Sequence, residues 1–289
     1  MPSHCSPDHT DIYDKTKTCY TKDQLVFIAS KYNNFYNNKK IPIKTKNSLK
    51  REILKQLHDR LKVHEHLWYK LEFMKTINEE NKKDLMESFK PQKPKEWQLN
   101  SKKWLNTYDI LNVMEQYEDK YRSYKFLGVF PIDFDHRVNG MYCVSPVMCN
   151  FDLKKMLRDG ITQCGAILNL DYHYQSGSHW VCMYIGLTPN NPNFGCYYID
   201  SGASKAPNEV VDFYQKVKSQ VQSQYSKDVS DKFKFKENKK QFQFKNTECG
   251  MFSMYFMIQF LRQKTFRSII NSKINDEEAF KLRDEYYLG

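Results

Sequence analysis

The chain has 289 residues, of which 40% are hydrophobic and 15% aromatic. This is enough to bury the core of one catalytic-sized domain and a smaller module, and it excludes a disordered protein. The longest strongly apolar run, residues 251–261, is far shorter than the roughly 20 residues that cross a bilayer, and the polar N-terminus lacks the apolar core of a signal peptide. We therefore expect no membrane association and no secretion.

The net charge of +11 is concentrated in the N-terminal third. Residues 1–95 carry 20 of the 45 basic side chains but 12 of the 34 acidic ones. Such an excess favours solubility and weak attraction to polyanions, whereas specific nucleic-acid binding also needs a recognisable reading element. We predict at most weak nucleic-acid binding through residues 1–95.

Cysteine usage indicates a reducing compartment. The eight cysteines form no CxxC pairs, and the chain is too large to need disulfide staples. We interpret all of them as reduced thiols in a cytosol-like compartment: Cys5, Cys19, Cys143, Cys149, Cys164, Cys182, Cys196 and Cys249.

Two histidine-containing stretches could suggest a metal. The N-terminal HCSPDH offers four potential zinc ligands, but their spacing matches no standard site. His64 and His66 lie in a predicted helical region, where residues i and i+2 diverge. We therefore predict neither a metal nor another cofactor. The four N-terminal candidates are His4, Cys5, Asp8 and His9.

The N-terminal third is predicted to be helical. Thr21 and Gln24 form a capping box ahead of apolar residues at helical spacing up to Tyr32. After a turn-rich connector at 33–43, leucine and isoleucine recur every four residues over 49–61, which predicts a second helix. More helix is expected over 66–77.

This pair of helices loosely resembles a SAP-type nucleic-acid-binding module, but a helical hairpin docked on the next domain is the favoured interpretation. Residues 89–100 contain two prolines and several lysines and are predicted to be a linker. We divide the chain into a helical basic accessory domain, 1–95, and a catalytic domain, 96–289.

The second part of the chain mixes helix and strand. Residues 104–121 are predicted to be helical, and short β-rich segments broken by Gly, Pro and Asn begin near residue 124. The expected class is α+β.

A histidine and an aspartate lie at the ends of two predicted strands. Residues 179–186 and 194–200 are β-like, with a Pro- and Asn-rich loop between them. If they pair antiparallel with residue numbers summing to about 379, His179 lies opposite Asp200, with Cβ atoms about 5 Å apart. The carboxylate could then orient one ring nitrogen and leave the other for proton transfer. A lone histidine or aspartate at a strand end is more typically solvated or caps the strand. The two together could form part of a catalytic site, which would also need a nucleophile.

Cys249 is the candidate nucleophile. It directly precedes the apolar run at 251–261, which predicts a buried helix with the thiol near its N-terminus. There the helix dipole and a nearby imidazolium favour the nucleophilic thiolate. Cys182 and Cys196 are expected to be ordinary core residues.

The segment before Cys249 alternates Lys or Gln with Phe over 232–245, which predicts extended structure. Gln243 lies six residues before Cys249, and Gln241 would share its face of a strand. The phenylalanines expected to point inward are Phe233, Phe235, Phe242 and Phe244.

These residues carry a family resemblance. A His-Trp pair, an Asp about twenty residues later and then Gln-x5-Cys-Gly resemble the cysteine proteases that include SUMO-processing enzymes, the adenovirus protease and polyprotein proteases of large DNA viruses. The African swine fever virus type is the most similar in pattern, over 164–185, 197–211 and 245–256, and residues 104–110 resemble the opening of the catalytic domain. The likeness covers roughly 100–289.

The resemblance implies a fold and a set of roles. The fold would be a mixed sheet packed against a central helix that carries the nucleophile. Cys249 would be the nucleophile, His179 the general base and then acid, Asp200 the orienting residue and Gln243 an oxyanion-hole donor, with Gln241 the alternative donor. Some viral members have Asn at the third position, so Asp200 would be the most replaceable. Trp180 would cover the substrate channel, although an ordinary core aromatic is equally compatible with its position.

We expect a cysteine endopeptidase that cleaves viral structural polyproteins after glycine, at Gly-Gly-X-like sites, during virion maturation. It would act in the virion and host cytoplasm if viral, and otherwise in the cytosol. The alternatives are a protease that deconjugates or processes a ubiquitin-like protein, and a nucleic-acid-binding accessory protein without activity.

Overall fold

The computed structural model describes residues 4–37, 40–43 and 49–289, and the chain divides into two compact units. The first contains Met1–Gln92 together with Tyr286–Gly289, and the second is Lys93–Glu285. The sequence pattern placed the boundary after residue 95 and gave no sign that the last four residues join the first unit. Within the described residues, no helix is both long and apolar enough to span a bilayer.

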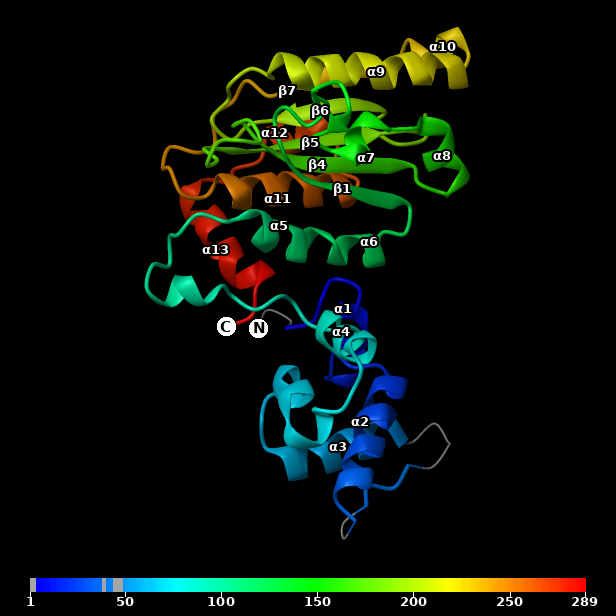
Figure 1. Ribbon diagram of the computed structural model, residues 1–289, viewed down its shortest axis with the longest axis vertical. Coiled ribbons are helices and arrows are strands. Elements are labelled where there is room, and N and C mark those ends of the chain that lie inside the picture. Colours follow the sequence, from blue (N-terminus) through cyan, green and yellow to red (C-terminus); the bar gives the residue numbers. More distant parts are fainter. Residues whose placement is uncertain (1–3, 38–39, 44–48) are drawn as a thin grey trace. The chain divides into compact units, whose positions relative to one another are not determined.

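The first unit is helical (Figure 1). The predicted capping box is confirmed, because the Thr21 side chain accepts from the Gln24 backbone N–H and the Gln24 side chain accepts from that of Thr21. The second predicted helix is also confirmed, but much of 66–77 forms short 3-10 helices instead of α-helix. Part of the predicted connector lies outside the described residues. The elements are α1 (Thr10–Thr16), α2 (Lys22–Phe35), α3 (Leu49–Leu61), η1 (Glu65–Lys70), η2 (Glu72–Met74) and α4 (Glu79–Glu87).

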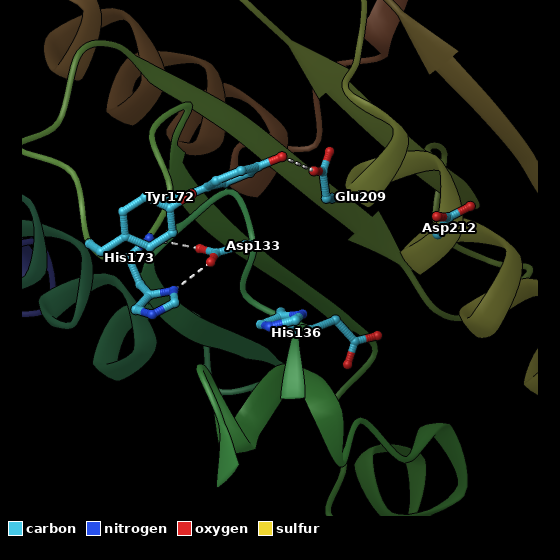
Figure 2. A pocket seen from close by; sticks show the side chains of 8 residues that line it. Asp133, His136, Tyr172, His173, Glu209 and Asp212 are labelled. Carbon is cyan, nitrogen blue, oxygen red and sulfur yellow. Dashed lines mark hydrogen bonds and ion pairs between the residues drawn. The ribbon is translucent and has the colours of Figure 1, made fainter. Parts of the chain in front are cut away.

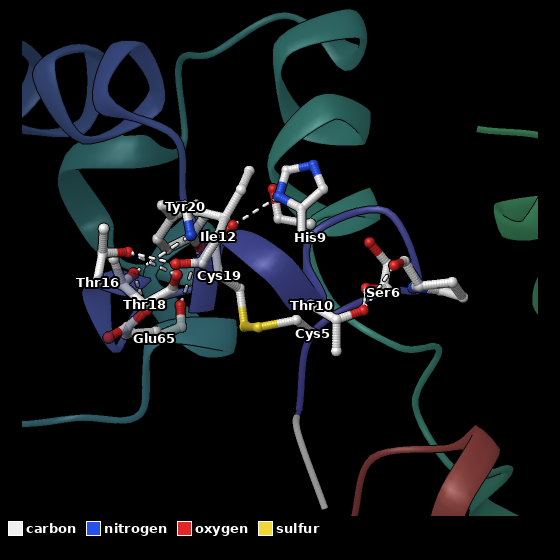
Figure 3. Close-up of a disulfide and its surroundings, with 12 residues drawn as sticks. Cys5, Ser6, His9, Thr10, Ile12, Thr16, Thr18, Cys19, Tyr20 and Glu65 are labelled. Atoms are coloured by element: carbon white, nitrogen blue, oxygen red, sulfur yellow. Dashed lines mark hydrogen bonds between the residues drawn. A yellow bond between two sulfur atoms is a disulfide. The ribbon is translucent and has the colours of Figure 1, made fainter. Parts of the chain in front are cut away.

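Two disulfides correct the prediction of eight reduced thiols. Cys5 is bonded to Cys19 in the first unit, where the short helix α1 brings their Cα atoms to 5.2 Å (Figure 3). Cys143 is bonded to Cys149 in the second unit. Cysteines far apart in sequence can meet in the fold, so the lack of CxxC pairs was a poor guide. The other four are free and buried.

Two of the four potential zinc ligands at the N-terminus make other contacts. The Cys5 sulfur lies in the disulfide, and a His9 ring nitrogen is 2.6 Å from the Cys19 carbonyl oxygen. The expected divergence of His64 and His66 is wrong, since their rings stack with centroids 5.7 Å apart. The reason is local. The backbone of His64 is extended, and the residue lies just before a 3-10 helix instead of inside an α-helix.

The second unit contains the predicted mixed sheet. It has five strands in the order β1-β4-β5-β6-β7. The outer pairs are parallel, and the central strand β5 is antiparallel to both neighbours. A small hairpin, β2 and β3, lies apart from this sheet. The strands are β1 (Tyr124–Pro131), β2 (Arg137–Val138), β3 (Tyr142–Cys143), β4 (Gln163–Asn169), β5 (Trp180–Gly186), β6 (Gly195–Ile199) and β7 (Lys234–Glu237).

Helices cover both faces of this sheet, with α9 on one face and α11 on the other (Figure 1). Helix α11 lies very close to β4, because a Cβ added at Gly165 would be 2.4 Å from the Met257 methyl carbon. The helices are η3 (Lys95–Gln98), α5 (Thr107–Met114), α6 (Gln116–Lys120), α7 (Pro146–Cys149), α8 (Leu153–Arg158), α9 (Asn208–Gln224), α10 (Lys227–Ser230), α11 (Cys249–Leu261), α12 (Phe266–Ile270) and α13 (Asp276–Tyr286).

The register of β5 and β6 differs from the prediction by two residues. Cys182 pairs with Ile199, so partner numbers sum to 381 instead of 379. His179 and Asp200 are therefore diagonal neighbours just beyond the ladder and not direct partners. Diagonal positions are about 7–8 Å apart at Cα, which long side chains can still bridge.

The extended structure predicted over 232–245 is confirmed only for β7. Beyond Glu237 the chain forms no strand before α11, so strict alternation is lost. Phe233 and Phe242 are buried as expected, but Phe244 is 76% exposed. Gln241 is exposed and Gln243 is buried, which corrects the expectation that they share a face.

Candidate active site

His179 and Asp200 are joined by a hydrogen bond at the end of the sheet. His179 directly precedes β5, Asp200 directly follows β6, and the distance from Nε2 of His179 to Oδ1 of Asp200 is 2.6 Å. The Asp200 side chain is 1% exposed and that of His179 is 24% exposed. Solvent can therefore reach the imidazole but not the carboxylate bound to it.

Hydrogen bonds fix both the side chain and the backbone of Asp200. Its carboxylate accepts from the backbone N–H groups of Gly202 and Ser204, at 2.7 and 3.0 Å. Its own backbone N–H and C=O are bound by the side-chain amide of Asn238, at 2.9 and 2.7 Å. The two bonds to the carboxylate stabilise a buried charge that would otherwise be costly, and the Asn238 bonds fix the backbone of Asp200.

The electrostatics of the pair favour a charged imidazole. Burial alone would lower the pKa of His179, but hydrogen bonds to Asp200 and Cys249 and the charges of both groups outweigh it and raise the pKa to about 10. Burial would likewise raise the pKa of Asp200, but His179 and two backbone N–H groups hold it below its ordinary value. Because Asp200 binds Nε2 of His179, Nδ1 is the ring nitrogen that remains to interact with the Cys249 thiol.

Cys249 is the first residue of α11 and is 2% exposed. The helix is buried nearly all round, as predicted, with Tyr255 as the exception. Its hydrogen-bond ladder begins with Phe252 N–H donating to the Glu248 carbonyl. The N–H groups of Cys249, Gly250 and Met251 therefore have no acceptor within the helix, and they concentrate positive potential beside the thiol.

A close packing contact fixes the first turn of α11. The Trp180 indole Nε1 donates to the Leu105 carbonyl oxygen at 3.0 Å. A Cβ added at Gly250 would lie 2.7 Å from Cδ1 of Leu105 and 3.3 Å from Cδ1 of Trp180. A larger residue at 250 would therefore have to displace the Leu105 side chain, and the largely buried Trp180 lies against the start of the helix.

Gln243 is held in one orientation by Ser201, the residue after Asp200. The Ser201 hydroxyl donates to Oε1 of Gln243 at 2.6 Å, and the Ser201 carbonyl accepts from the backbone N–H groups of Phe242 and Gln243. With its oxygen occupied, the Gln243 amide presents its NH2 group as a donor elsewhere. Gln241 instead donates to the backbone carbonyl of Gln243.

A buried ion pair lies directly before the thiol. Glu248, the residue preceding Cys249, pairs with Arg283 of α13, with Nε to Oε2 at 2.9 Å and Nη2 to Oε1 at 3.1 Å. Both side chains are almost fully buried.

Sequence reasoning missed Ser201, Asn238 and the Glu248–Arg283 pair. Ser201 follows Asp200 directly, so its proximity could have been inferred, but the partner of its hydroxyl could not. Asn238 and Arg283 lie 38 and 35 residues from their partners. No local pattern marks contacts of that kind.

A separate cavity of about 520 Å³ lies in the second unit (Figure 2). In it, Nδ1 of His173 is 2.5 Å from the Asp133 carboxylate, and the Tyr172 hydroxyl contacts Glu209 at 3.4 Å. Its described lining offers carboxylates, imidazoles and phenols but no thiol. The lining residues are Asp133, Asp135, His136, Tyr172, His173, Tyr174, Glu209 and Asp212.

Sequence comparison finds relatives among viral thiol proteases. A protein of Acanthamoeba polyphaga mimivirus described as a thiol protease is 29% identical over 300 residues, covering 98% of this chain and 92% of its own. A protein of African swine fever virus described as a SUMO-1 cysteine protease is 23% identical over 124 residues, covering 43% of each chain.

Structural comparison gives the same fold. The crystal structure of the African swine fever virus pS273R protease aligns over 100% of this chain and 96% of its own, with 17% identity and a TM-score of 0.65. Residues 166–288 match the Ulp1 protease family, C-terminal catalytic domain. Over residues 166–288 the chain is thus similar to the catalytic domain of the Ulp1 protease family.

Proposed function

We propose that the protein is a cysteine endopeptidase in which Cys249 is the nucleophile, His179 the general base and then acid, and Asp200 the residue that orients the imidazole. The observation that carries this proposal is the interaction of His179 with both Asp200 and Cys249 at the N-terminus of a buried helix. An imidazolium beside a thiol at a helix N-terminus favours the thiolate, which attacks a peptide carbonyl.

The oxyanion formed by that attack would be bound by Gln243 and by the first backbone N–H groups of α11. The Ser201 hydroxyl supports this role, because it occupies the amide oxygen of Gln243 and leaves the NH2 group to donate. His179 would then protonate the leaving amine, and water would hydrolyse the thioester with His179 again acting as base.

The proposed substrates are viral structural polyproteins cut after glycine during virion maturation. The viral relatives and the sequence resemblance support this class. Trp180, packed against the start of α11, would roof the channel for an extended chain and leave little room for side chains beside the scissile bond. Glycine suits such a slot because it has no Cβ.

Replacing the thiol tests the mechanism. Cys249→Ala should abolish cleavage without unfolding the protein, because the change in side-chain size is small. The matched control is Cys182→Ala, which removes another buried free thiol on β5 and should retain cleavage. Activity is measured by mass-spectrometric mapping of cuts in co-expressed virion proteins, and substantial cleavage by the folded Cys249→Ala variant would refute the mechanism.

A deconjugating or processing protease for a ubiquitin-like protein is the second candidate. It is favoured by the relative described as a SUMO-1 cysteine protease. Incubation with ubiquitin-like precursors distinguishes the two, because a polyprotein protease should leave them intact. Weak nucleic-acid binding by the basic residues of 1–95 would be an accessory property of either enzyme.

A further inference from the structure

The Glu248–Arg283 ion pair is held more firmly than a simple surface bridge. Its two nitrogen–oxygen contacts are bidentate, and the side chains are 2% and 3% exposed. The guanidinium also lies 4.3 Å from the centre of the Trp97 ring and donates from Nη1 to the Lys103 carbonyl at 3.0 Å. Each of the three guanidinium nitrogens therefore has an acceptor, and Arg283 has a fixed position.

The position of Glu248 makes this pairing unusual. Glu248 is the N-cap residue of α11, where a carboxylate ordinarily accepts from the first helical N–H groups and is attracted by the helix dipole. Here the Glu248 side chain makes no capping hydrogen bond. Oε2 accepts from Arg283, and Oε1 accepts from both Arg283 and the Thr247 hydroxyl.

We propose that Arg283 is a positioning residue for the active site: it neutralises Glu248 and keeps its carboxylate away from the N-terminus of α11. The first-turn N–H groups and the helix dipole then act on the Cys249 thiolate and on the oxyanion instead of on a neighbouring carboxylate. The inference rests on the proposed role of Cys249 as nucleophile.

Other charged groups near this site must be considered in any pH measurement. Burial raises the pKa of Asp109 on α5, with Glu96 also raising it and Arg283 and Lys103 lowering it. Asp109 caps its own helix and is unchanged in every variant compared below. His179 faces the thiol as well, and Asp200 is hydrogen-bonded to His179.

Three variants with opposite expectations test the proposal. Arg283→Met leaves the carboxylate of the residue next to Cys249 unpaired. For two unit charges separated by about 6 Å at an effective dielectric of about 20, the Coulomb energy corresponds to a change of about 100-fold in the thiolate equilibrium. The acid limb of the kcat/KM profile should therefore move up by about 2 pH units. Glu248→Gln leaves the arginine charge alone and should move the limb down. In the double variant both charges are absent, and the profile should return close to wild type.

The rate of Cys249 alkylation by iodoacetamide gives a readout that needs no substrate. At a pH below the acid limb of the wild type, this rate should fall about 100-fold in Arg283→Met and recover to within about fivefold of wild type in the double variant. Glu285→Gln is the matched control on the same helix, because Glu285 forms an exposed pair with Arg262 at 3.9 Å. This control should leave the rate unchanged.

Several outcomes would overturn the proposal. One is an unmoved acid limb in folded Arg283→Met, and another is a folded double variant as slow as Arg283→Met, since a purely structural role predicts no rescue. If Arg283→Met does not fold, an unmoved limb in Glu248→Gln decides against the proposal. Failure of the proposed function is recognised separately, by cleavage that survives in Cys249→Ala.

Discussion

Ser201→Ala tests whether the orientation of Gln243 matters for the reaction. The substitution removes the hydroxyl that donates to Oε1 of Gln243 at 2.6 Å, while the Ser201 carbonyl can still accept from residues 242 and 243. The loop should therefore keep its course. The amide of Gln243 becomes free to rotate, so its NH2 group is no longer directed by this bond.

The structure bounds the size of this effect. A buried hydrogen-bonding group left without a partner costs about 1–3 kcal/mol, which corresponds to about 5- to 150-fold in rate. The upper bound is the full loss of an oxyanion donor, about 10²–10³-fold in kcat. We expect a decrease in kcat of about 10- to 100-fold for Ser201→Ala, with KM nearly unchanged because the oxyanion exists only in the transition state.

The assay is a double-mutant cycle on kcat with a peptide cut by the wild-type protein. Because Ser201 is expected to act through Gln243, Ser201→Ala should have almost no further effect in a Gln243→Ala background. Ser201→Thr, which keeps a hydroxyl, should retain most of the activity. Fully additive losses, or a Ser201→Ala variant that changes only KM, would refute the reasoning.

Three further predictions concern His179, Trp180 and the basic N-terminal third. Because the pKa of His179 is raised, the stability that its charged form contributes is fully present below pH 6.5 and is lost progressively as pH rises from there through about 10. Asp200→Asn should therefore move the alkaline limb of kcat/KM to lower pH but harm activity less than His179→Ala does; an unmoved limb would contradict the assigned interaction. Trp180→Ala should weaken the preference for glycine in a peptide library that varies the two residues before the cut, and a wild-type preference for bulky residues at both positions would exclude the channel. The intact protein should bind DNA weakly, with binding that fades as salt rises from about 50 to 200 mM, and salt-resistant, sequence-selective binding would instead favour the SAP-like interpretation.

The strands around His179 and Asp200 could be predicted because their sequences are continuous apolar runs bounded by turn residues. The register could not be predicted to the residue, because it depends on the conformation of the loop between Gly186 and Gly195. The two-residue error did not separate the side chains, since both lie at the same end of neighbouring strands and are long enough to meet.

The segment before Cys249 shows why alternation alone is insufficient. Its pattern predicts a strand through Phe244, but β7 ends at Glu237 and Phe244 is exposed. From there the course of the chain is set by distant partners. The N–H groups of Phe244 and Lys245 donate to the carboxylate of Asp276, and that contact spans more than 30 residues.

The end of the predicted linker and the residues that follow it have a direct part in fixing the proposed nucleophile. Trp97 packs on Arg283, and the Lys103 carbonyl accepts from it, so this stretch supports the ion pair that ends on Glu248. Two residues further on, the Leu105 carbonyl accepts from Trp180, and the Leu105 side chain packs against Gly250. Residues on both sides of Cys249 are therefore held by one short length of chain. A displacement of that chain would change the helix N-terminus and the proposed channel roof together. The prolines and lysines of the predicted linker are therefore a poor guide to its flexibility.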